Sequence, residues 1–389
     1  MIQFVDPRTN PAPPARVSRE LAAHGEELRE LITYCLSGRV YDAEQWIQAG
    51  RSIQALDYKR PKRSPVLSPL RAAVRKNHAD VVLLLLCNGY RLDLEPADGD
   101  TVLDEALRIR AFDIVDLLLK WGADPTKVEA CNVVDTYQTD LIDRFWKAGV
   151  DYSVDPSFVM YLAETANKPL YGWLRRYRSD QRLQDALDVA LYEAVIQNKE
   201  KVVHLLRWAG ADPHRKVPSA RDLGEPDAWA EDMVSSSAET AITFGRHELF
   251  GVLHVATMPD LDAQFPRVHD AETLKQLLAI CQPSDWSGVI VNFLRELRRT
   301  FLRDSTWDAR AALEFIGTSG GRLTAVPPDE LRWLRGDLLA TDGANDFLWA
   351  LRWLRQEKHC DPAIYADLIR TPSMKGKMEA LNAGGRTTP

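Results

Sequence analysis

Residues 101–125 read TVLDEALRIRAFDIVDLLLKWGADP and contain two amphipathic helical patterns separated by a tight break. Thr101 is placed to accept a backbone N–H at the start of the first helix. Gly122 supplies the left-handed residue that ends the second helix, and Pro125 keeps that helix from continuing. The stretch therefore predicts a pair of short helices with a defined beginning and end.

A near copy of this stretch begins 33 residues upstream and reads SPLRAAVRKNHADVVLLLLCNGYRLD. Ser68 aligns with Thr101, and Gly89 aligns with Gly122. The second helix of each copy carries an apolar stripe too wide for an isolated surface helix, so neighbouring copies must cover it. Self-similarity at this period predicts a solenoid of stacked helix pairs.

The repeat unit resembles the ankyrin family, whose pattern is roughly TPLHxAAxxGHxxVVxLLLxxGAD. The first copy matches at Ser68, Pro69, Leu70, Ala72, Ala73, His78, Val81, Val82 and Gly89. The second matches at Thr101, Leu103, Ala106, Val115, Gly122, Ala123 and Asp124. Arg71 and Asp104 stand where the family usually has His. Asn77 and Arg110 stand where it has Gly between the helices. We expect these departures to weaken local hydrogen bonding without changing the fold.

The same pattern recurs along the chain with varying quality. Twelve residues separate Gly38 from Gly50 and Asn198 from Gly210, and a further repeat is expected around Gly245. The sequence predicts an all-α fold, an ankyrin-repeat solenoid that continues into a helical C-terminal region. We divide it into an extended Pro-rich arm (1–20), the ankyrin-repeat array (21–262), the helical C-terminal region (263–381) and a flexible tail (382–389). The C-terminal region is either a set of degenerate repeats or a small bundle.

Bulk properties narrow the classes of function. The 389 residues carry a net charge of −7 with a pI near 5.7, which argues against bulk nucleic-acid binding. One dense basic cluster, KRPKR at 59–63, is either a targeting or anion-binding patch or a solvated finger. The five cysteines are widely spaced and odd in number, as expected for reduced thiols in a cytoplasmic protein. We find no signal-peptide pattern and no membrane-length apolar run, so neither secretion nor membrane association is expected.

Few motifs suggest chemistry. GTSGG at 317–321 fits the pattern G-x-S-x-G with Ser319 in the nucleophile position, but that motif needs a strand before it and a helix after it. A helical run precedes it here, which favours a loop between helices. His247 and His254, seven residues apart, could share one helix face, but no further ligand is spaced to join them. We therefore expect no catalytic residue, no metal and no cofactor.

The resemblance implies that the chain binds another protein through its turn tips and the outer side of its first helices. Carried onto this sequence, the partner-binding residues are Arg75, Lys76, Asp98, Asp100, Arg108 and Ile109. The implied function is that of a non-enzymatic scaffold or regulator. The alternatives are a hydrolase-like enzyme with its site in the C-terminal third and a weak nucleic-acid binder. We expect that reversing Arg75 and Lys76 to Glu leaves folding intact and weakens partner capture.

Overall fold

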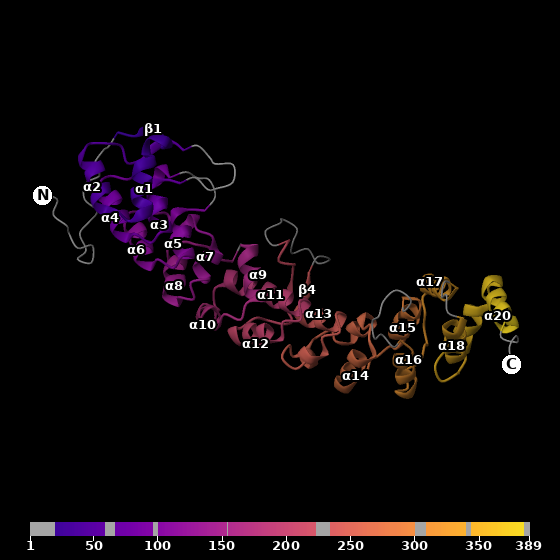
Figure 1. Ribbon diagram of the computed structural model, residues 1–389. Helices are drawn as coiled ribbons and strands as arrows, with labels where there is room; N and C mark the ends of the chain where they lie inside the picture. Colours follow the sequence, from indigo (N-terminus) through magenta and orange to yellow (C-terminus); the bar gives the residue numbers. More distant parts are fainter. Residues whose placement is uncertain are drawn as a thin grey trace. The chain divides into compact units, whose positions relative to one another are not determined.

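The computed structural model describes residues 20–58, 67–95, 100–153, 155–222, 234–299, 309–339 and 344–384 (Figure 1). The expected arm, apart from its last residue, lies outside these ranges, as do KRPKR and residues 385–389. Helices dominate the described part, and the strands are two or three residues long. The chain forms two compact units. Unit 1 is Met1–Leu162 with Asn167–Leu183, and unit 2 is Ala163–Ala166 with Gln184–Pro389.

In unit 1 the helices come in pairs, each made of a first and a second helix joined by a short turn. The pairs are α1 (Arg29–Ser37) and α2 (Val40–Gln48), α3 (Pro69–Arg75) and α4 (Ala79–Cys87), α5 (Val102–Arg108) and α6 (Phe112–Lys120), α7 (Ala130–Val134) and α8 (Thr139–Lys147), and α9 (Pro156–Glu164) and α10 (Lys168–Arg176). First helices pack on first helices, α1 on α3, α3 on α5 and α5 on α7 (Figure 1). Among the second helices, α2 packs on α4, α4 on α6 and α8 on α10. This stacking of like on like confirms the predicted array.

Short elements close the start of unit 1 and connect its pairs. Strand β1 (Ala22–His24) pairs in parallel with β2 (Ala55–Asp57). The 3-10 turns are η1 (Gly25–Leu28), η2 (Leu92–Leu94) and η3 (Pro125–Lys127). The two strands join the segment before α1 to the segment after α2, so the first pair is closed on its outer side by its own flanking chain.

A left-handed residue stands at each turn inside the first four pairs. The φ angles are 68° at Gly38, 57° at Asn77, 58° at Arg110 and 61° at Tyr137. Twelve residues further on, each second helix is followed by a left-handed glycine. These glycines are Gly50, Gly89, Gly122 and Gly149. The left-handed conformation costs a residue with a side chain roughly 1–2 kcal/mol. The spacing of twelve residues between the two left-handed positions is therefore set by the backbone, because Asn, Arg and Tyr adopt the left-handed conformation at the first position as glycine does.

The departures from the family pattern at the first helices do not weaken hydrogen bonding, so this expectation is wrong. Asp104 is 1% exposed, and its carboxylate accepts the backbone N–H of Thr101 at 2.8 Å. It also accepts the backbone N–H of Glu129 at 3.0 Å and the side-chain amide of Asn132 at 2.9 Å. A carboxylate has acceptor sites for several donors at once. Asp104 therefore joins its own helix start to the next repeat.

An aromatic cluster fills the space around α8 and α10. Trp146 stacks on Tyr152 with centroids 5.9 Å apart and an interplanar angle of 18°. Trp173 meets Tyr152 edge-on at 5.8 Å and lies 4.9 Å from Tyr177. Tyr152, Phe158 and Trp173 are fully buried.

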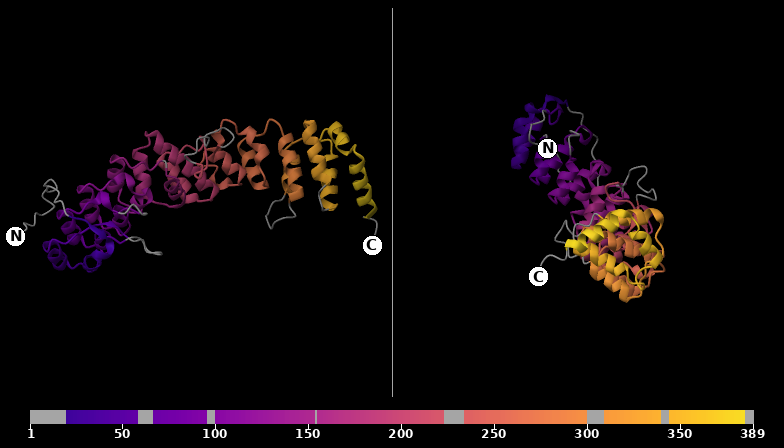
Figure 2. Two further views of the ribbon diagram at one scale, coloured as in Figure 1. Left: turned by 90° about the horizontal axis from the view of Figure 1, so that it is seen from above. Right: turned by 90° about the vertical axis from the view of Figure 1, so that its right-hand side faces the viewer.

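Unit 2 begins with another pair of the same kind, α11 and α12. The helices of unit 2 are α11 (Gln181–Ile196), α12 (Glu200–Ala209), α13 (Ser237–Thr243), α14 (Ala271–Ile280), α15 (Ser287–Arg299), α16 (Ala309–Thr318), α17 (Pro328–Leu339), α18 (Ala344–Leu354), α19 (Pro362–Ile369) and α20 (Pro372–Gly384). Asn198, at φ 55°, and Gly210, at φ 117°, repeat the left-handed pattern around α12. Strands β3 (Lys216–Val217) and β4 (Ser235–Ser236) form an antiparallel hairpin. Further on, α16 packs against α14 and α15, and the orange and yellow helices of this unit stand side by side in Figure 2.

The repeat expected around Gly245 is complete only in its first half. Helix α13 and the left-handed Gly245 are present. The predicted second helix is instead a series of 3-10 turns, η4 (His247–Leu249) and η5 (Val255–Thr257), and η6 (Asp262–Arg267) follows. Gly251 is a poor helix former, and His254 is left-handed at φ 52°. His247 and His254 therefore do not share a helix face.

Candidate docking surface

Two of the predicted binding residues occupy equivalent places on neighbouring repeats. Lys76 caps the C-terminal end of α3, and Ile109 caps that of α5. Both are exposed, and Ile109 leaves 42% of its surface to solvent. Asp98 lies outside the described residues. The ends of the first helices thus place one cation and one large apolar side chain in solvent.

Other predicted binding residues already have partners within the chain. Arg75 Nη2 lies 2.8 Å from Glu105 Oε1, and the Glu105 side chain is only 7% exposed. Arg108 Nη2 lies 2.6 Å from Asp100 Oδ2, with both side chains at least one third exposed. Arg75 therefore helps to hold α3 against α5. Reversing its charge would place two carboxylates together, so the expectation that this change leaves folding intact needs revision.

Tyr137 belongs to the same surface, although the sequence did not single it out. It is 45% exposed, and the Arg110 guanidinium lies 5.7 Å from its ring centroid. Arg110 also donates to the backbone carbonyl of Asp135 at 3.1 Å. Ile109, Arg110 and Tyr137 thus form a continuous surface across two repeats, which we call the turn patch. The signal was present in the sequence, because Tyr137 stands twelve residues before Gly149.

A buried ionic network lies between α3 and α5. Arg71 is 2% exposed and contacts Glu95 Oε2 at 3.0 Å and Glu105 Oε1 at 3.2 Å. The hydroxyls of Tyr90 and Ser68 donate to Glu95 as well. Burial raises the pKa of the Glu95 carboxyl, and these donors with Arg71 oppose that effect. The network fixes the two helices whose ends carry Lys76 and Ile109.

The motif around Ser319 is the end of a helix. Helix α16 precedes it, Gly320 is left-handed at φ 83°, and the amide of Gly321 donates to the carbonyl of Ile316 at 2.8 Å. These bonds close a helix C-terminus. Within the described ranges no strand leads into Ser319, so the strand–turn–helix geometry that a nucleophile elbow needs is not found there.

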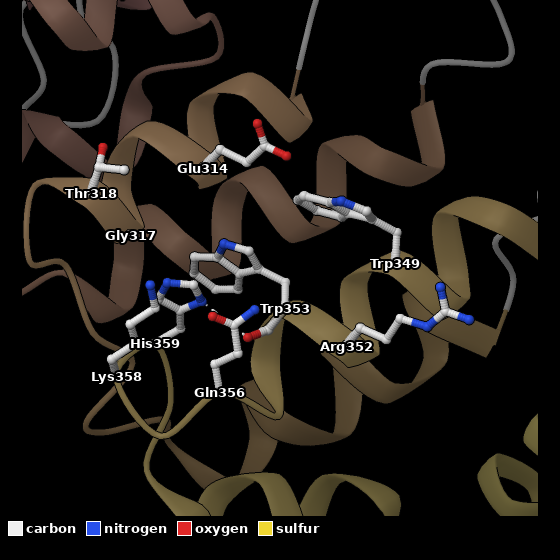
Figure 3. Close-up of a pocket in the computed structure, with 9 residues that line it drawn as sticks. All are labelled: Glu314, Gly317, Thr318, Trp349, Arg352, Trp353, Gln356, Lys358 and His359. Atoms are coloured by element: carbon white, nitrogen blue, oxygen red, sulfur yellow. Dashed lines mark hydrogen bonds between the residues drawn. The ribbon is translucent and has the colours of Figure 1, made fainter.

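A pocket of about 340 Å³ lies beside that helix end (Figure 3). Helix α16, helix α18 and the loop after α18 line it, and Glu314 and His359 are among the lining residues. In the part of the chain that the structure covers, no hydrogen bond joins the Ser319 hydroxyl to a histidine or carboxylate, and no group of three His, Cys, Asp or Glu side chains is placed to hold a metal ion. The pocket presents ring faces, cations and one carboxylate.

The cysteines and the lengths of the helices bear on where the protein could work. All five cysteines are free thiols. Burial raises the pKa of Cys35 to about 12 and that of Cys360 to about 11, so these thiols stay protonated. Every helix among the described residues is too short or too polar to cross a bilayer.

Comparison with known proteins gives similarity to solved structures only. No protein-family model matches the chain, and no curated protein matches it. The human ASB11 ankyrin repeat domain is 22% identical over 52% of this chain and 95% of its own, with a TM-score of 0.34. An ankyrin repeat domain from Acinetobacter baumannii is 18% identical over 58% of this chain and 96% of its own, with a TM-score of 0.31. The helix pairs and left-handed turns described above show that unit 1 and the helices α11 and α12 form an all-α array of stacked helix-pair repeats.

Proposed function

We propose that the chain is a non-enzymatic protein-binding module that captures a partner protein on the turn patch of unit 1. The observation that supports this most is the pair of large apolar side chains, Ile109 and Tyr137, that stay more than 40% exposed in consecutive repeats. Arg110 joins them through its contact with the Tyr137 ring. Exposed aromatic, apolar and arginine side chains are the types that contribute most binding energy at protein interfaces.

The charge around the patch indicates the chemistry of the partner. Arg110, the next residue after Ile109, is an exposed cation, and Lys76 is an exposed cation at the equivalent place of the preceding repeat. Arg108, in contrast, is neutralised by Asp100. A partner that presents an apolar side chain flanked by acidic residues would complement this surface. Bulk nucleic acid fits less well, because the chain carries a net charge of −7.

The wider assignment is part of the same proposal. Ankyrin-type repeats are taken to span 21–262, with the helices of 263–381 as a helical C-terminal region. Protonated, unpaired thiols such as Cys35 suit a reducing compartment, so the cytoplasm is the proposed location. A hydrolase-like site at Ser319 remains the second candidate, because Glu314 and His359 line the neighbouring pocket.

The test compares two changes to the turn patch with a matched exposed apolar residue. Ile109→Lys copies the residue of the preceding repeat, and Tyr137→Asn keeps a side chain that tolerates φ 61°. Leu56→Ser removes an apolar side chain that is 72% exposed on β2. The partner is first captured from the native cell and purified, and its affinity for each variant is then measured by titration. We expect the double variant to bind at least tenfold more weakly than the intact chain and the control to bind equally well.

Two results would contradict the proposal. If the double variant binds the partner as tightly as the intact chain, the turn patch is not the docking surface. If Leu56→Ser weakens binding equally, the surface has been placed on the wrong part of unit 1. Far-UV circular dichroism and the urea midpoint confirm that each variant remains folded.

A further inference from the structure

The pocket in unit 2 contains a buried donor that lacks a partner. Trp353 is 4% exposed, and among the described residues its Nε1–H has no hydrogen-bond acceptor. An indole N–H only donates, and a buried donor without an acceptor destabilises the site that contains it. A ligand that brings an acceptor oxygen into the pocket would satisfy this group.

The surroundings of Trp353 hold the ring in place. His359 stacks on it with centroids 4.4 Å apart and an interplanar angle of 19°. His359 Nδ1 lies 3.1 Å from the carbonyl oxygen of Trp353. Gly317 makes room for the imidazole, because a Cβ at that position would lie 2.5 Å from His359 Nε2. The indole is therefore fixed in an orientation that it cannot leave to find another acceptor.

Charge at the pocket favours an anion. Arg352 and Lys358 line it, and Glu314 is the one carboxylate among its lining residues (Figure 3). Two cations against one carboxylate attract a negatively charged group. Trp349, which is half-buried, adds an aromatic wall.

We propose that this pocket binds a peptide carboxylate that lies next to an aromatic or long apolar side chain. The Trp353 Nε1–H donates to a carboxylate oxygen, Arg352 and Lys358 supply the positive field, and the apolar side chain packs on Trp349. A volume of about 340 Å³ lies at the low end of ligand pockets, about 300–1,000 Å³, and suits a short peptide segment. This site is in unit 2 and does not depend on the docking surface proposed for unit 1.

The carboxylate can come from an acidic side chain or from a chain terminus, and four peptides separate these sources. Acetyl-Glu-Phe-amide is compared with acetyl-Gln-Phe-amide, and acetyl-Ala-Phe with its C-terminal amide. The indole N–H resonance of Trp353 in the full-length protein, identified by its loss in Trp353→Phe, is followed during each titration. We expect a saturable shift with at least one acid, which binds at least tenfold more tightly than its amide. Equal affinity for the acid and the amide, or no shift with any peptide, would overturn the proposal.

Variants assign the roles of the side chains. Arg352→Ala and Lys358→Ala should each weaken binding of the preferred acid about threefold to tenfold by calorimetry. Trp353→Phe keeps a ring for His359 but removes the donor, and it should weaken binding at least tenfold. Arg355→Ala is the matched control, since Arg355 is exposed directly after α18 but does not line the pocket. If Arg355→Ala weakens binding as much as Arg352→Ala, the attraction is diffuse and the pocket is not the site.

Discussion

The contact of α3 with α5 and that of α8 with α10 join successive repeats of unit 1 by different chemistry. Between α3 and α5, Arg71 lies buried between Glu95 and Glu105. Around α8 and α10, Trp146, Tyr152 and Trp173 fill the space with ring contacts. Both junctions connect the same kind of helix pair. The repeat therefore requires filled volume and satisfied polar groups at its junctions, and not one fixed set of residues.

The two junctions should differ in how they respond to solution conditions. When one partner of a buried ion pair is removed or changes its charge, the other is left as an uncompensated buried charge, which is strongly destabilising. Ring packing depends on the volume and shape of the side chains, which pH and salt do not alter. Each of the following substitutions tests this difference.

Trp173→Ala should cause the largest loss, about 4 kcal/mol in the free energy of unfolding, because a fully buried Trp leaves a large cavity. Urea unfolding at pH 7 and pH 5 should show nearly the same loss at both values. Trp173→Phe, which keeps a buried ring, should lose less than half as much. A loss that changes markedly with pH would show that charges around Asp143 control this junction.

Arg71→Met should cost about 3 kcal/mol at pH 7, because it leaves Glu95 and Glu105 buried without their shared cation. Burial already raises the pKa of Glu95. A carboxyl whose pKa is higher in the folded than in the unfolded state contributes its full stability at pH values below the unfolded-state pKa. That contribution is lost as pH rises through the folded-state pKa. Removing Arg71 raises the folded pKa further, so the deficit should shrink as pH falls from 7 to 5. A deficit that is the same at both pH values would contradict this account.

Arg75→Glu should cost about 2 kcal/mol, since the hydrogen-bonded pair with buried Glu105 becomes a like-charge contact. Arg75 is partly exposed, so solvent screening keeps this loss below that of Arg71→Met. Lys76→Glu is the matched control and should change stability by less than about 0.5 kcal/mol. The pair of measurements, made by urea unfolding, separates the structural cation from the surface cation. Equal effects would show that Glu105 does not depend on Arg75.

Asp143→Asn should have a small effect of about 1 kcal/mol on the polar rim of the aromatic junction. Asp143 accepts hydrogen bonds from Trp173 Nε1 at 3.3 Å and from the Tyr177 hydroxyl, and it pairs with Lys147 at 2.6 Å. Hydrogen bonding to Lys147 and Tyr177 lowers the pKa of Asp143. Thermal unfolding at low and high salt measures the change. A loss as large as that of Trp173→Ala would mean that the carboxylate, and not the rings, holds the junction.

Apart from the second helix expected after Gly245, the sequence was sufficient to predict the repeat period, the helix pairs of unit 1 and the residues that end them. These depend on local backbone chemistry, in which glycine spacing and hydroxyl caps at Ser68 and Thr101 recur at fixed intervals. The ionic network was not predicted, because its partners lie 24 and 34 residues apart in the chain. Hydrophobic periodicity carries no information on which distant Glu meets which Arg.

The same limit applies to the candidate surfaces. Ile109 was found from its place at the end of a first helix, and its exposure agrees with that position. Tyr137 was missed because only its spacing of twelve residues from Gly149 marks the turn, and the pattern of the short first helix, CNVVDTY, does not. The pocket at Trp353 was beyond prediction, because it arises where α16 and α18 come together.

The left-handed turns have a consequence for how such an array changes its specificity. Positions 77, 110 and 137 hold Asn, Arg and Tyr in nearly one backbone conformation, and all three side chains are exposed. A side chain can be exchanged there with little effect on the packing of the helices, because the core stripe uses other positions. Evolution, or a designed library, can therefore rewrite this row of three positions while the core stays unchanged. The stability change is set by how well each residue tolerates positive φ and by the contacts that it gives up, such as the hydrogen bond of Arg110 to Asp135.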